Sequence, residues 1–523
     1  MDTITVIKNF IDDNDIKYLL VNSTNEFLVE YNSPEENSRY KLTNFSGSTG
    51  EALVTPDRIY QFVDGRYHIQ ADQEVNHEIV TVVKLKNNQS EQEEIIKLIP
   101  EYETLGVFAK KLSQKKYEFF KAKRNIKLLN TDPLDTEIQR KNNKDITLDI
   151  SLTGLTPEEK IQKISQNLKS DECIYITDLD EVSYLYNKRN FSQNFSAKIT
   201  ARAIIGKDKN TLYSGEGLKN LERDLENINK KVYIDKSSIN AYEYRLLGNN
   251  AVEMKENPVQ IMKAQKNDTE LEHLKKAFQK TDNALKAVRD YIEKSSNISE
   301  FDIAQKLETE FIKQGAAGLS FKPIVAKDKN SALAHYSKSS KDEIITEGSL
   351  VLIDCGAYFD GGLATDVTRV FVKGEPSELH KKIYTYVLKA FLLAYNYAKT
   401  NPQRPVSGYD IDYPVHKLFE TFDLNGFVFN HGLGHGIGIN VHEFPPKLSP
   451  HELSKTPLKE GMCFSIEPGL YKEGAFGVRL ENSCYFKDNQ IHSFVKMNYE
   501  KKLIDFEMLT PQEKVQLEEF EVL

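Results

Sequence analysis

Apolar residues recur with a helical period along residues 268–294, the most regular stretch of this chain. They stand at Leu271, Leu274, Phe278, Leu285, Val288 and Ile292. This spacing of about 3.6 residues is typical of an amphipathic helix with one buried face. Asn267 and Glu270 fit a capping box at its start. The pattern therefore predicts one long helix over Asp268–Lys294.

Shorter patterned segments precede this helix. Residues 51–63 (EALVTPDRIYQFV) are typical of a hairpin, and residues 91–99 (EQEEIIKLI) predict a helix that ends before a proline. A further helix is expected from Pro157, and a strand over Cys173–Thr177. A polar linker is expected at Arg140–Asp145, so the pattern predicts an α/β block on each side of it.

Two apolar runs in the last third predict paired, buried strands that each carry an aspartate. The run Leu350–Ile353 ends at Asp354, and Asp366 opens the run Val367–Val372. The glycine-rich link between the runs is typical of a hairpin. Paired strands bring the two carboxylates together, and buried like charges repel unless a cation lies between them.

Two more carboxylates and a histidine-rich segment follow in the same third. Glu467 comes after the run Met462–Ile466, and Glu481 comes after Gly477–Leu480. Residues 431–442 hold three histidines among alternating glycines, which permit a close backbone approach. Four carboxylates with one imidazole suit two divalent cations such as Mn²⁺, Fe²⁺ or Co²⁺. Each residue taken singly also fits a turn or cap, so this pattern alone predicts no more than a metal hydrolase.

Composition narrows the class of protein. A length of 523 residues predicts two to four domains, and 39% hydrophobic with 28% charged residues is typical of a soluble globular chain. The net charge of −9 argues against non-specific nucleic-acid binding. The lysine-rich segment Lys110–Arg124 could be a nucleic-acid patch, but an amphipathic helix is favoured. No signal peptide or membrane-spanning run is expected. Four scattered cysteines suit a reducing cytoplasm and argue against a thiolate metal site.

Five short motifs in the last third stand in the order found in one known family. They are Ile353-Asp354-Cys355-Gly356, Thr365-Asp366-Val367-Thr368-Arg369, His431-Gly432-Leu433-Gly434-His435-Gly436 with Val441-His442-Glu443, Ile466-Glu467-Pro468-Gly469-Leu470-Tyr471 and Val478-Arg479-Leu480-Glu481-Asn482. With these motifs the chain resembles the pita-bread metallopeptidases, a group that includes methionine aminopeptidase, prolidase and aminopeptidase P.

Motifs in the first half extend the resemblance over nearly the whole chain. Phe45–Gly50 and Val63–Tyr67 are similar to the N-terminal domain of aminopeptidase P, and Leu179–Asn187 to the middle domain of its three-domain form. The resemblance implies an α/β (α+β) chain with two creatinase-type α/β domains before a catalytic pita-bread domain. The expected ranges are 1–145, 146–262 and 263–523.

The resemblance also implies a site. Its metal ligands would be Asp354, Asp366, His435, Glu467 and Glu481. Asp366 and Glu481 would bridge the two ions, and Arg479 would support the bridging carboxylate. The histidines expected to contact substrate or the reacting carbonyl are His335, His431 and His442. Tyr471 joins His335 as a candidate for the proline pocket.

The implied activity is that of a metal-dependent aminopeptidase that cleaves between any N-terminal residue and a penultimate proline. A water activated by two divalent ions would attack, with Glu467 moving protons and His442 stabilising the oxyanion. Manganese is the expected metal, with zinc, cobalt or iron as alternatives. A cytoplasmic homodimer is also implied, acting on peptides and not on nucleic acid or membranes.

Alternatives stay open at this point. A prolidase would accept only Xaa-Pro dipeptides, whereas a metal-free binding scaffold or a creatinase-like hydrolase would lack most of the ligands. One departure from the family pattern affects the site: twelve positions separate Asp354 from Asp366, where the family usually has eleven. A longer hairpin tip absorbs the extra residue most simply. A one-residue shift of register would instead turn Asp366 to the other face of the sheet.

Overall fold

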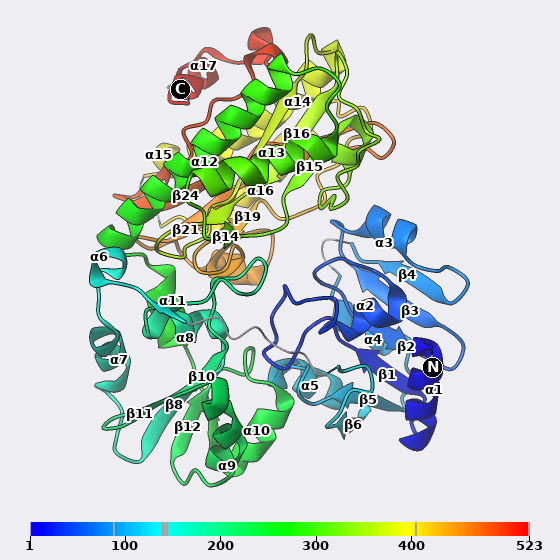
Figure 1. Cartoon of the computed structure of the whole chain (residues 1–523), viewed down its shortest axis with the longest axis vertical. Helices are drawn as coiled ribbons and strands as arrows, with labels where there is room; N and C mark the ends of the chain where they lie inside the picture. Colours follow the sequence, from blue (N-terminus) through cyan, green and yellow to red (C-terminus); the bar gives the residue numbers. More distant parts are fainter. Residues whose placement is uncertain (1, 87–88, 137–144, 403–404, 521–523) are drawn as a thin grey trace. The chain divides into compact units, whose positions relative to one another are not determined.

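The computed structural model describes residues 2–86, 89–136, 145–402 and 405–520, and the chain divides into two compact units (Figure 1). Unit 1 holds residues 1–144, 157–188 and 199–259, and unit 2 holds residues 145–156, 189–198 and 260–523. The predicted linker Arg140–Asp145 lies outside the described residues apart from Asp145. The boundaries of the three predicted domains stay predictions.

Unit 1 begins with a mixed six-stranded sheet in the order β4-β3-β2-β1-β5-β6. Its strands are β1 Tyr18–Val21, β2 Ala52–Val54, β3 Ile59–Val63, β4 Val80–Lys84, β5 Thr104–Phe108 and β6 Asn125–Leu129. Its helices are α1 Thr3–Asp13, α2 Ser38–Thr43, α3 His68–Glu74, α4 Glu91–Lys97 and α5 Gln114–Lys121. Alternating residues of β1 enter two different apolar cores, Leu19 and Val21 one of them and Leu20 the other. The predicted hairpin at 51–63 is confirmed by the antiparallel β2 and β3, and the predicted helix at 91–99 by α4.

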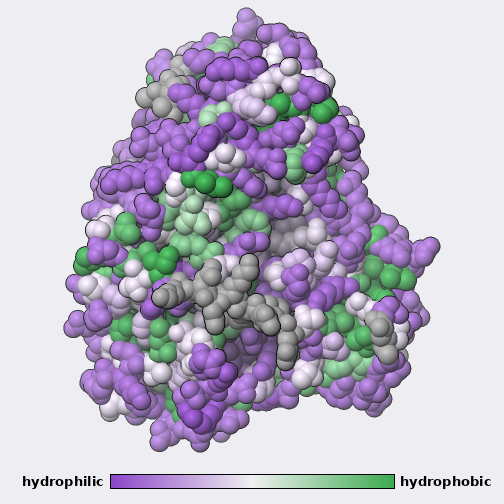
Figure 2. Space-filling model, viewed as in Figure 1, coloured by the Kyte–Doolittle hydropathy of each residue, from purple (hydrophilic) through white to green (hydrophobic). Residues whose placement is uncertain are grey.

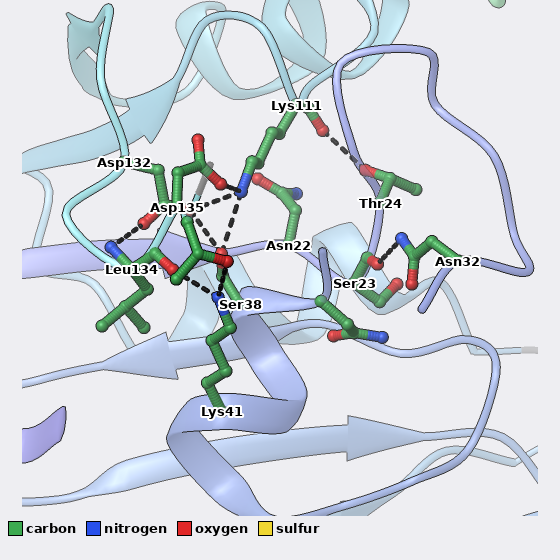
Figure 3. Close-up of polar contacts among 12 residues, drawn as sticks. Asn22, Ser23, Thr24, Asn32, Ser38, Lys41, Lys111, Asp132, Leu134 and Asp135 are labelled. Carbon is green, nitrogen blue, oxygen red and sulfur yellow. Dashed lines mark hydrogen bonds and ion pairs between the residues drawn. The ribbon is translucent and has the colours of Figure 1, made fainter. Parts of the chain in front are cut away.

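The lysine-rich segment forms helix α5, as favoured from its pattern. Lys111 lies just before the helix, and its side chain is 5% exposed and pairs with Asp132 at 2.8 Å. Its ammonium also donates to Ser38 Oγ at 2.9 Å (Figure 3). Lys116 of α5 pairs with Glu51 at 2.9 Å. Both lysines therefore form ion pairs with carboxylates inside unit 1.

A second sheet of unit 1 has the order β11-β10-β8-β12-β13. Its strands are β8 Glu172–Ile176, β10 Ala201–Gly206, β11 Asn210–Ser214, β12 Lys231–Ile234 and β13 Ala251–Glu253. The helices in this part are α7 Pro157–Ser165, α8 Leu179–Leu185, α9 Leu221–Glu226 and α10 Ala241–Leu247, with 3-10 turns η1 Gly215–Asn220 and η2 Gly248–Asn250. The predicted helix start at Pro157 and the predicted strand near Cys173–Thr177 are confirmed by α7 and β8.

Unit 2 carries the candidate chemistry. Its helices are α6 Ile150–Thr153, α11 Pro258–Ala264, α12 Asp268–Lys294, α13 Glu300–Lys313, α14 Glu378–Tyr395, α15 Tyr397–Thr400, α16 Gly408–Glu420 and α17 Pro511–Glu518. Its strands are β14 Gly318–Leu319, β15 Ile324–Lys327, β16 Leu350–Cys355, β17 Ala357–Tyr358, β18 Val367–Val372, β19 Gly434–Gly436, β20 Glu443–Leu448, β21 Cys463–Ile466, β22 Gly469–Tyr471, β23 Gly477–Arg479, β24 Asn482–Lys487 and β25 Gln490–Ser493. The short strands β7 Ile146–Thr147 and β9 Lys188–Arg189 complete the strand list, and 3-10 turns lie at η3 Asp328–Ala332, η4 Glu452–Lys455, η5 Lys501–Leu503 and η6 Phe506–Met508.

Unit 2 contains two larger antiparallel sheets. Their strand orders are β15-β16-β18 and β20-β19-β21-β24-β25. The predicted helix over Asp268–Lys294 is confirmed as α12, and the Asn267–Glu270 capping box is present. Figure 1 shows α12 and α13 running beside each other along this part of the molecule. Buried residues of α14 and α16 join those of both sheets in one apolar core. Both sheets therefore pack against these helices, and the ends of their strands carry the candidate site residues.

The surface is mostly hydrophilic on the face that Figure 2 displays, with hydrophobic residues gathered in separate groups. Among the helices in the described ranges, none is both long and apolar enough to span a lipid bilayer.

Candidate metal centre

The pairing of β16 with β18 sets the positions of the first two aspartates. Asp354 lies opposite Thr368, and Cys355 lies opposite Val367. Side chains alternate along a strand, so Asp366, two residues before Thr368, belongs to the same face as Asp354. The register shift that would turn Asp366 away is not present in this pair.

The extra residue is taken up in the link, which is more elaborate than the plain hairpin turn that the sequence predicted. Ala357 and Tyr358 form β17, which pairs with β14. At the tip, the Gly361 N–H donates to His273 Nε2 at 2.8 Å. Arg189 Nε donates to the Gly362 carbonyl at 3.1 Å, and Gly362 has a φ of 58°. The tip is thus held by side chains from two other segments while the strand register is kept.

His435 and Glu467 come from neighbouring strand segments of the second sheet. Ser465 Oγ accepts from the His435 N–H at 3.1 Å and donates to Glu467 Oε1 at 3.2 Å. His435 Nδ1 lies 3.0 Å from the Gly436 carbonyl oxygen, which can only accept, so Nδ1 donates this hydrogen bond. Nε2 points to the carboxylates, 3.5 Å from Asp366 Oδ2 and 3.4 Å from Glu467 Oε1.

Thr368 and Arg479 connect Glu481 to Asp354 through a chain of hydrogen bonds. Thr368 Oγ1 donates to Glu481 Oε2 at 2.7 Å and accepts from Arg479 Nε at 3.1 Å. Arg479 Nη2 donates to Asp354 Oδ2 at 2.6 Å. The arginine was expected to support a bridging carboxylate. Its direct partner is Asp354, and it reaches Glu481 through Thr368.

Burial makes this carboxylate cluster electrostatically costly. Burial raises the pKa of Glu467 to about 7, although Arg479 opposes the shift. Burial, followed by the Glu481 and Asp354 carboxylates, holds the pKa of Asp366 well above its ordinary value. Burial and the Glu467 carboxylate do the same to the pKa of Glu481. The positive charge of Arg479 therefore does not offset the burial and mutual repulsion of Asp366, Glu467 and Glu481.

Divalent cations fit the donor set. Asp366, His435 and Glu481 each offer one ligand atom, and these atoms lie within 4.8 Å of one another. Asp354 Oδ1 and Glu481 Oε1 are buried and have no hydrogen-bond partner among the described residues. Buried carboxylate oxygens normally have such a partner, and a bound cation would supply it. The oxygen-rich set with one imidazole matches hard or borderline divalent ions.

The remaining predicted residues adjoin this cluster. Tyr471 Oη accepts from Arg479 Nη1 at 2.8 Å and lies 2.9 Å from His431 Nε2. The His442 ring packs edge-on against His435 with centroids 4.4 Å apart. The Ala334 carbonyl, next to His335 in the chain, accepts from Arg479 Nη1 at 3.2 Å. These contacts join the predicted residues in one set within unit 2, which the backbone beside His335 also reaches.

The glycines of the histidine-rich segment allow the close approach that the sequence predicted. A Cβ on Gly434 would lie 2.0 Å from the Ser465 carbonyl oxygen, and a Cβ on Gly436 would lie 2.6 Å from that of Glu443. Only glycine leaves room for the neighbouring strand at these distances. The glycines thus bring His435 against β21 and the Glu467 segment.

Several residues that support the site were not predicted from the sequence. Arg369, fully buried, donates to the Glu481 carbonyl at 2.7 Å and to the Met497 carbonyl at 2.7 Å. Glu443 pairs with Lys263 at 3.0 Å and with Lys266 at 3.3 Å. Arg369 and Glu443 lie within the family motifs, so the sequence did contain a signal for these two residues. Nothing in the local pattern marked the two lysines.

Comparisons with known proteins agree with this architecture. A model described as metallopeptidase family M24 matches residues 272–488. Two models described as creatinase/prolidase N-terminal domain match residues 4–140 and 135–270. The predicted order of two creatinase-type domains and one pita-bread domain is therefore confirmed.

Relatives match along nearly the full chain. Xaa-Pro aminopeptidase 1 of Dictyostelium discoideum is 27% identical over 581 residues, covering 97% of this chain and 90% of that protein. A probable Xaa-Pro aminopeptidase P of Pyricularia oryzae is 28% identical over 598 residues, covering 100% of this chain and 95% of that protein. The structure of a Caenorhabditis elegans X-prolyl aminopeptidase, described as a cytosolic enzyme with a di-nuclear active site, has 20% identity and a TM-score of 0.84 and covers 97% of this chain and 92% of that chain. At that identity the likeness shows a shared fold.

Proposed function

This chain belongs to metallopeptidase family M24, in the form with two creatinase/prolidase N-terminal domains, and we propose from this that it is an Xaa-Pro aminopeptidase. It hydrolyses the bond between any N-terminal residue and a penultimate proline, as a metal-dependent enzyme. The observation that carries the proposal is the convergence of four carboxylates, three of them buried, and His435 in one cluster within the matched region. Relatives named for this activity match over nearly their whole length.

Two divalent ions would be held by the carboxylate cluster. The proposed ligands are Asp354, Asp366, His435, Glu467 and Glu481. When bound, such ions lower the pKa of a water from about 15.7 towards ~7 and so supply a nucleophile. We propose manganese, because hard oxygen donors dominate the set. The buried, partnerless oxygens of Asp354 and Glu481 support this assignment.

Glu467 is suited to proton transfer. In the metal-free chain burial raises the pKa of its carboxyl to about 7, and a positioned carboxylate is one of the side chains that serve in general acid–base catalysis. Ser465 fixes its Oε1 by a hydrogen bond of 3.2 Å. In the proposed reaction Glu467 accepts a proton from the attacking water and returns one to the proline nitrogen. His442, packed against His435, would donate to the oxyanion that develops on the scissile carbonyl.

A pocket that selects proline should recognise its shape more than its hydrogen bonds, because a proline in a peptide bond has no N–H and a fixed φ. The His431–Tyr471 pair is the proposed wall of this pocket, with the two rings 5.4 Å apart between centroids. Tyr471 is oriented by Arg479 and His431, so its ring offers a fixed apolar surface. His335 is proposed to contact the substrate from the neighbouring segment.

Activity on peptides of two lengths tests the proposal. Metal-stripped protein is mixed with an Xaa-Pro-Yaa tripeptide or the matching Xaa-Pro dipeptide, with and without Mn²⁺, and release of the first residue is followed. Metal-dependent cleavage of the tripeptide is expected. Cleavage of the dipeptide alone would make the protein a prolidase, and cleavage of neither would favour a binding scaffold.

A variant pair tests the role of Glu467. Glu467→Gln should abolish turnover, whereas Glu473→Gln, an exposed change on the following turn, should leave it intact. Retained turnover in Glu467→Gln would contradict the proton-transfer role.

We also propose a cytoplasmic homodimer. The four cysteines are free and buried, as suits a reducing compartment, and the C. elegans relative is described as cytosolic. The dimer rests on the family resemblance, and light scattering of the purified protein measures it directly.

A further inference from the structure

The segment between β15 and β16 carries His335, and it has little regular structure of its own. The 3-10 turn η3 spans Asp328–Ala332, and an irregular stretch follows. The Ala334 carbonyl accepts from Arg479, the same side chain that binds Asp354. This segment therefore lies directly beside the carboxylate cluster, and its conformation decides where His335 stands.

One buried carboxylate holds this segment from outside the metal cluster. Glu300, the first residue of α13, is 0% exposed. Its Oε1 accepts from the Lys327 N–H at 2.6 Å and from Asn330 Nδ2 at 2.9 Å. Its Oε2 accepts from the Ser340 N–H at 3.0 Å and lies 2.8 Å from Tyr336 Oη, whose one proton is shared with the Lys338 carbonyl oxygen at 2.6 Å. The four donors stand on both sides of His335 in the chain.

We propose that Glu300 is a positioning residue for the peptidase reaction, holding residues 327–340 in the conformation that presents His335 to the metal cluster. The inference rests on the proposed function. A carboxylate has about four lone-pair sites, and here each oxygen receives two donors. Because all four donor groups are neutral, these hydrogen bonds orient the segment but do not neutralise the negative charge of Glu300.

Two observations separate this role from simple helix capping. The cap of α13 is made by Ser299 and Asp302, whose side chains and backbone N–H groups bond reciprocally. Glu300 instead directs its side chain to residues 327–340. Burial also raises the pKa of Glu300, and its hydrogen bonds oppose that shift. A buried charge is costly, so packing alone does not account for a glutamate here.

A double-mutant cycle tests whether Glu300 acts through His335. Glu300→Gln turns one oxygen into an amino group that faces two donors, so the segment must rearrange. We expect kcat to fall by up to ~100-fold, the scale on which a misplacement of about 1 Å costs rate, with KM changing much less. In a His335→Ala background the same change should have little further effect. Fully additive losses would overturn the proposal.

Asp302→Asn is the matched control, since it disturbs the same helix end without touching residues 327–340. It should lower thermal stability while leaving the balance of kcat and KM unchanged. A fall in kcat equal to that of Glu300→Gln would assign the effect to the helix end and overturn the proposal. If Glu300→Gln does not fold, Tyr336→Phe removes one donor and keeps the ring. It should lower kcat in the same direction by a smaller factor, and an unchanged kcat would count against the proposal.

Hydrogen exchange supplies a readout that does not depend on activity. Backbone amides of residues 327–340 should exchange faster in Glu300→Gln than in the parent protein or Asp302→Asn. Unchanged exchange in that segment would contradict the positioning role. An inactive parent enzyme would defeat the proposed function itself. An active parent with additive losses and unchanged exchange would defeat only the inference about Glu300.

Discussion

Arg479 Nη2 lies 2.6 Å from Asp354 Oδ2, and the two side chains are 3% and 12% exposed. The same guanidinium donates to Tyr471, to Thr368 and to the Ala334 carbonyl. One cation thus orients a candidate metal ligand, a candidate pocket residue and the segment that carries His335. It also carries positive charge into a cluster of carboxylates.

Arg479→Lys should therefore lower kcat/KM by about 10- to 100-fold, the usual range for groups that orient metal ligands. A lysine ammonium is a point charge and cannot form the planar, multi-sided contacts of a guanidinium. Steady-state kinetics at saturating Mn²⁺, together with a calorimetric Mn²⁺ titration, measure the loss. Arg289→Lys, on the outer side of α12, is the control and should match the parent protein. A fully active Arg479→Lys would contradict the role assigned to the arginine.

Metal-free protein should lose stability as pH rises through the neutral range. The pKa of Glu467 is about 7 in the folded chain and 4.5 ordinarily, so between these values the folded state holds a proton that the unfolded state has released. The free energy of unfolding then falls with pH across this window, by about 1.4 kcal/mol for each unit of pKa difference. The raised pKa values of Asp366 and Glu481 act in the same direction.

Thermal unfolding of chelator-treated protein at several pH values between 5 and 8 measures this effect. Added Mn²⁺ should raise Tm, and more at pH 8 than at pH 5, because cations compete with protons for the same oxygens. Glu467→Gln should flatten the metal-free profile, whereas Glu473→Gln should not. A metal-free Tm that climbs steadily from pH 5 to pH 8 would refute the assigned sign.

Gly361→Ala should destabilise the tip that carries the extra residue. A Cβ there would lie 2.5 Å from the His273 ring, which also accepts from the Gly361 N–H. Overpacking of this kind costs about 1–3 kcal/mol, measurable by urea unfolding. Gly318→Ala is the control, because nothing lies within 4 Å of its added Cβ. The loss should shrink in the Gly361→Ala/His273→Ala double variant, and equal losses at Gly361 and Gly318 would exclude the contact as the cause.

Local patterns were sufficient to predict several elements. Helix α12 follows from a 3.6-residue period and its own capping residues, which lie within a few positions of each other. The strands β16 and β18 follow from apolar runs buried along their whole length. In these cases the signal and the structure it specifies occupy the same short segment. The motifs likewise identified the cluster that the structure brings together, from Asp354 to Glu481.

Contacts between distant segments could not be predicted in this way. Glu300 binds a segment 27 to 40 residues further along the chain, and Lys266 binds Glu443 across 177 positions. A lysine or glutamate in isolation is normally solvated, so no local pattern predicted that Glu300 or Lys266 would be buried. Only tertiary packing determines which buried charge meets which partner. The direct contact of Arg479 with Asp354, with Thr368 between Arg479 and Glu481, has the same origin.

Glu443→Gln should be among the most destabilising single changes in unit 2. The side chains of Lys263, Lys266 and Glu443 are 4%, 3% and 1% exposed, and both ammonium groups share Glu443 Oε2. Removing the negative charge leaves two buried ammonium groups without this partner, and breaking such a pair costs about 3–5 kcal/mol. Glu443 Oε1 also accepts from the Asn440 N–H at 3.1 Å, which fixes the turn before His442. Glu443→Gln should thus lower both Tm and the proline-dependent kcat.

The control for this change is Glu420→Gln, which breaks the exposed Lys417–Glu420 pair, with side chains 51% and 62% exposed. Surface pairs contribute about 0–1 kcal/mol, so this variant should unfold with the parent protein. The triple variant Glu443→Gln/Lys263→Met/Lys266→Met removes all three charges and should recover much of the lost Tm. If burial of the two ammonium groups without the Glu443 charge is the cause, stability returns with the methionines. If Tm stays low, the lost stability comes from the contact of Glu443 with Asn440 and not from the ion pairs with Lys263 and Lys266.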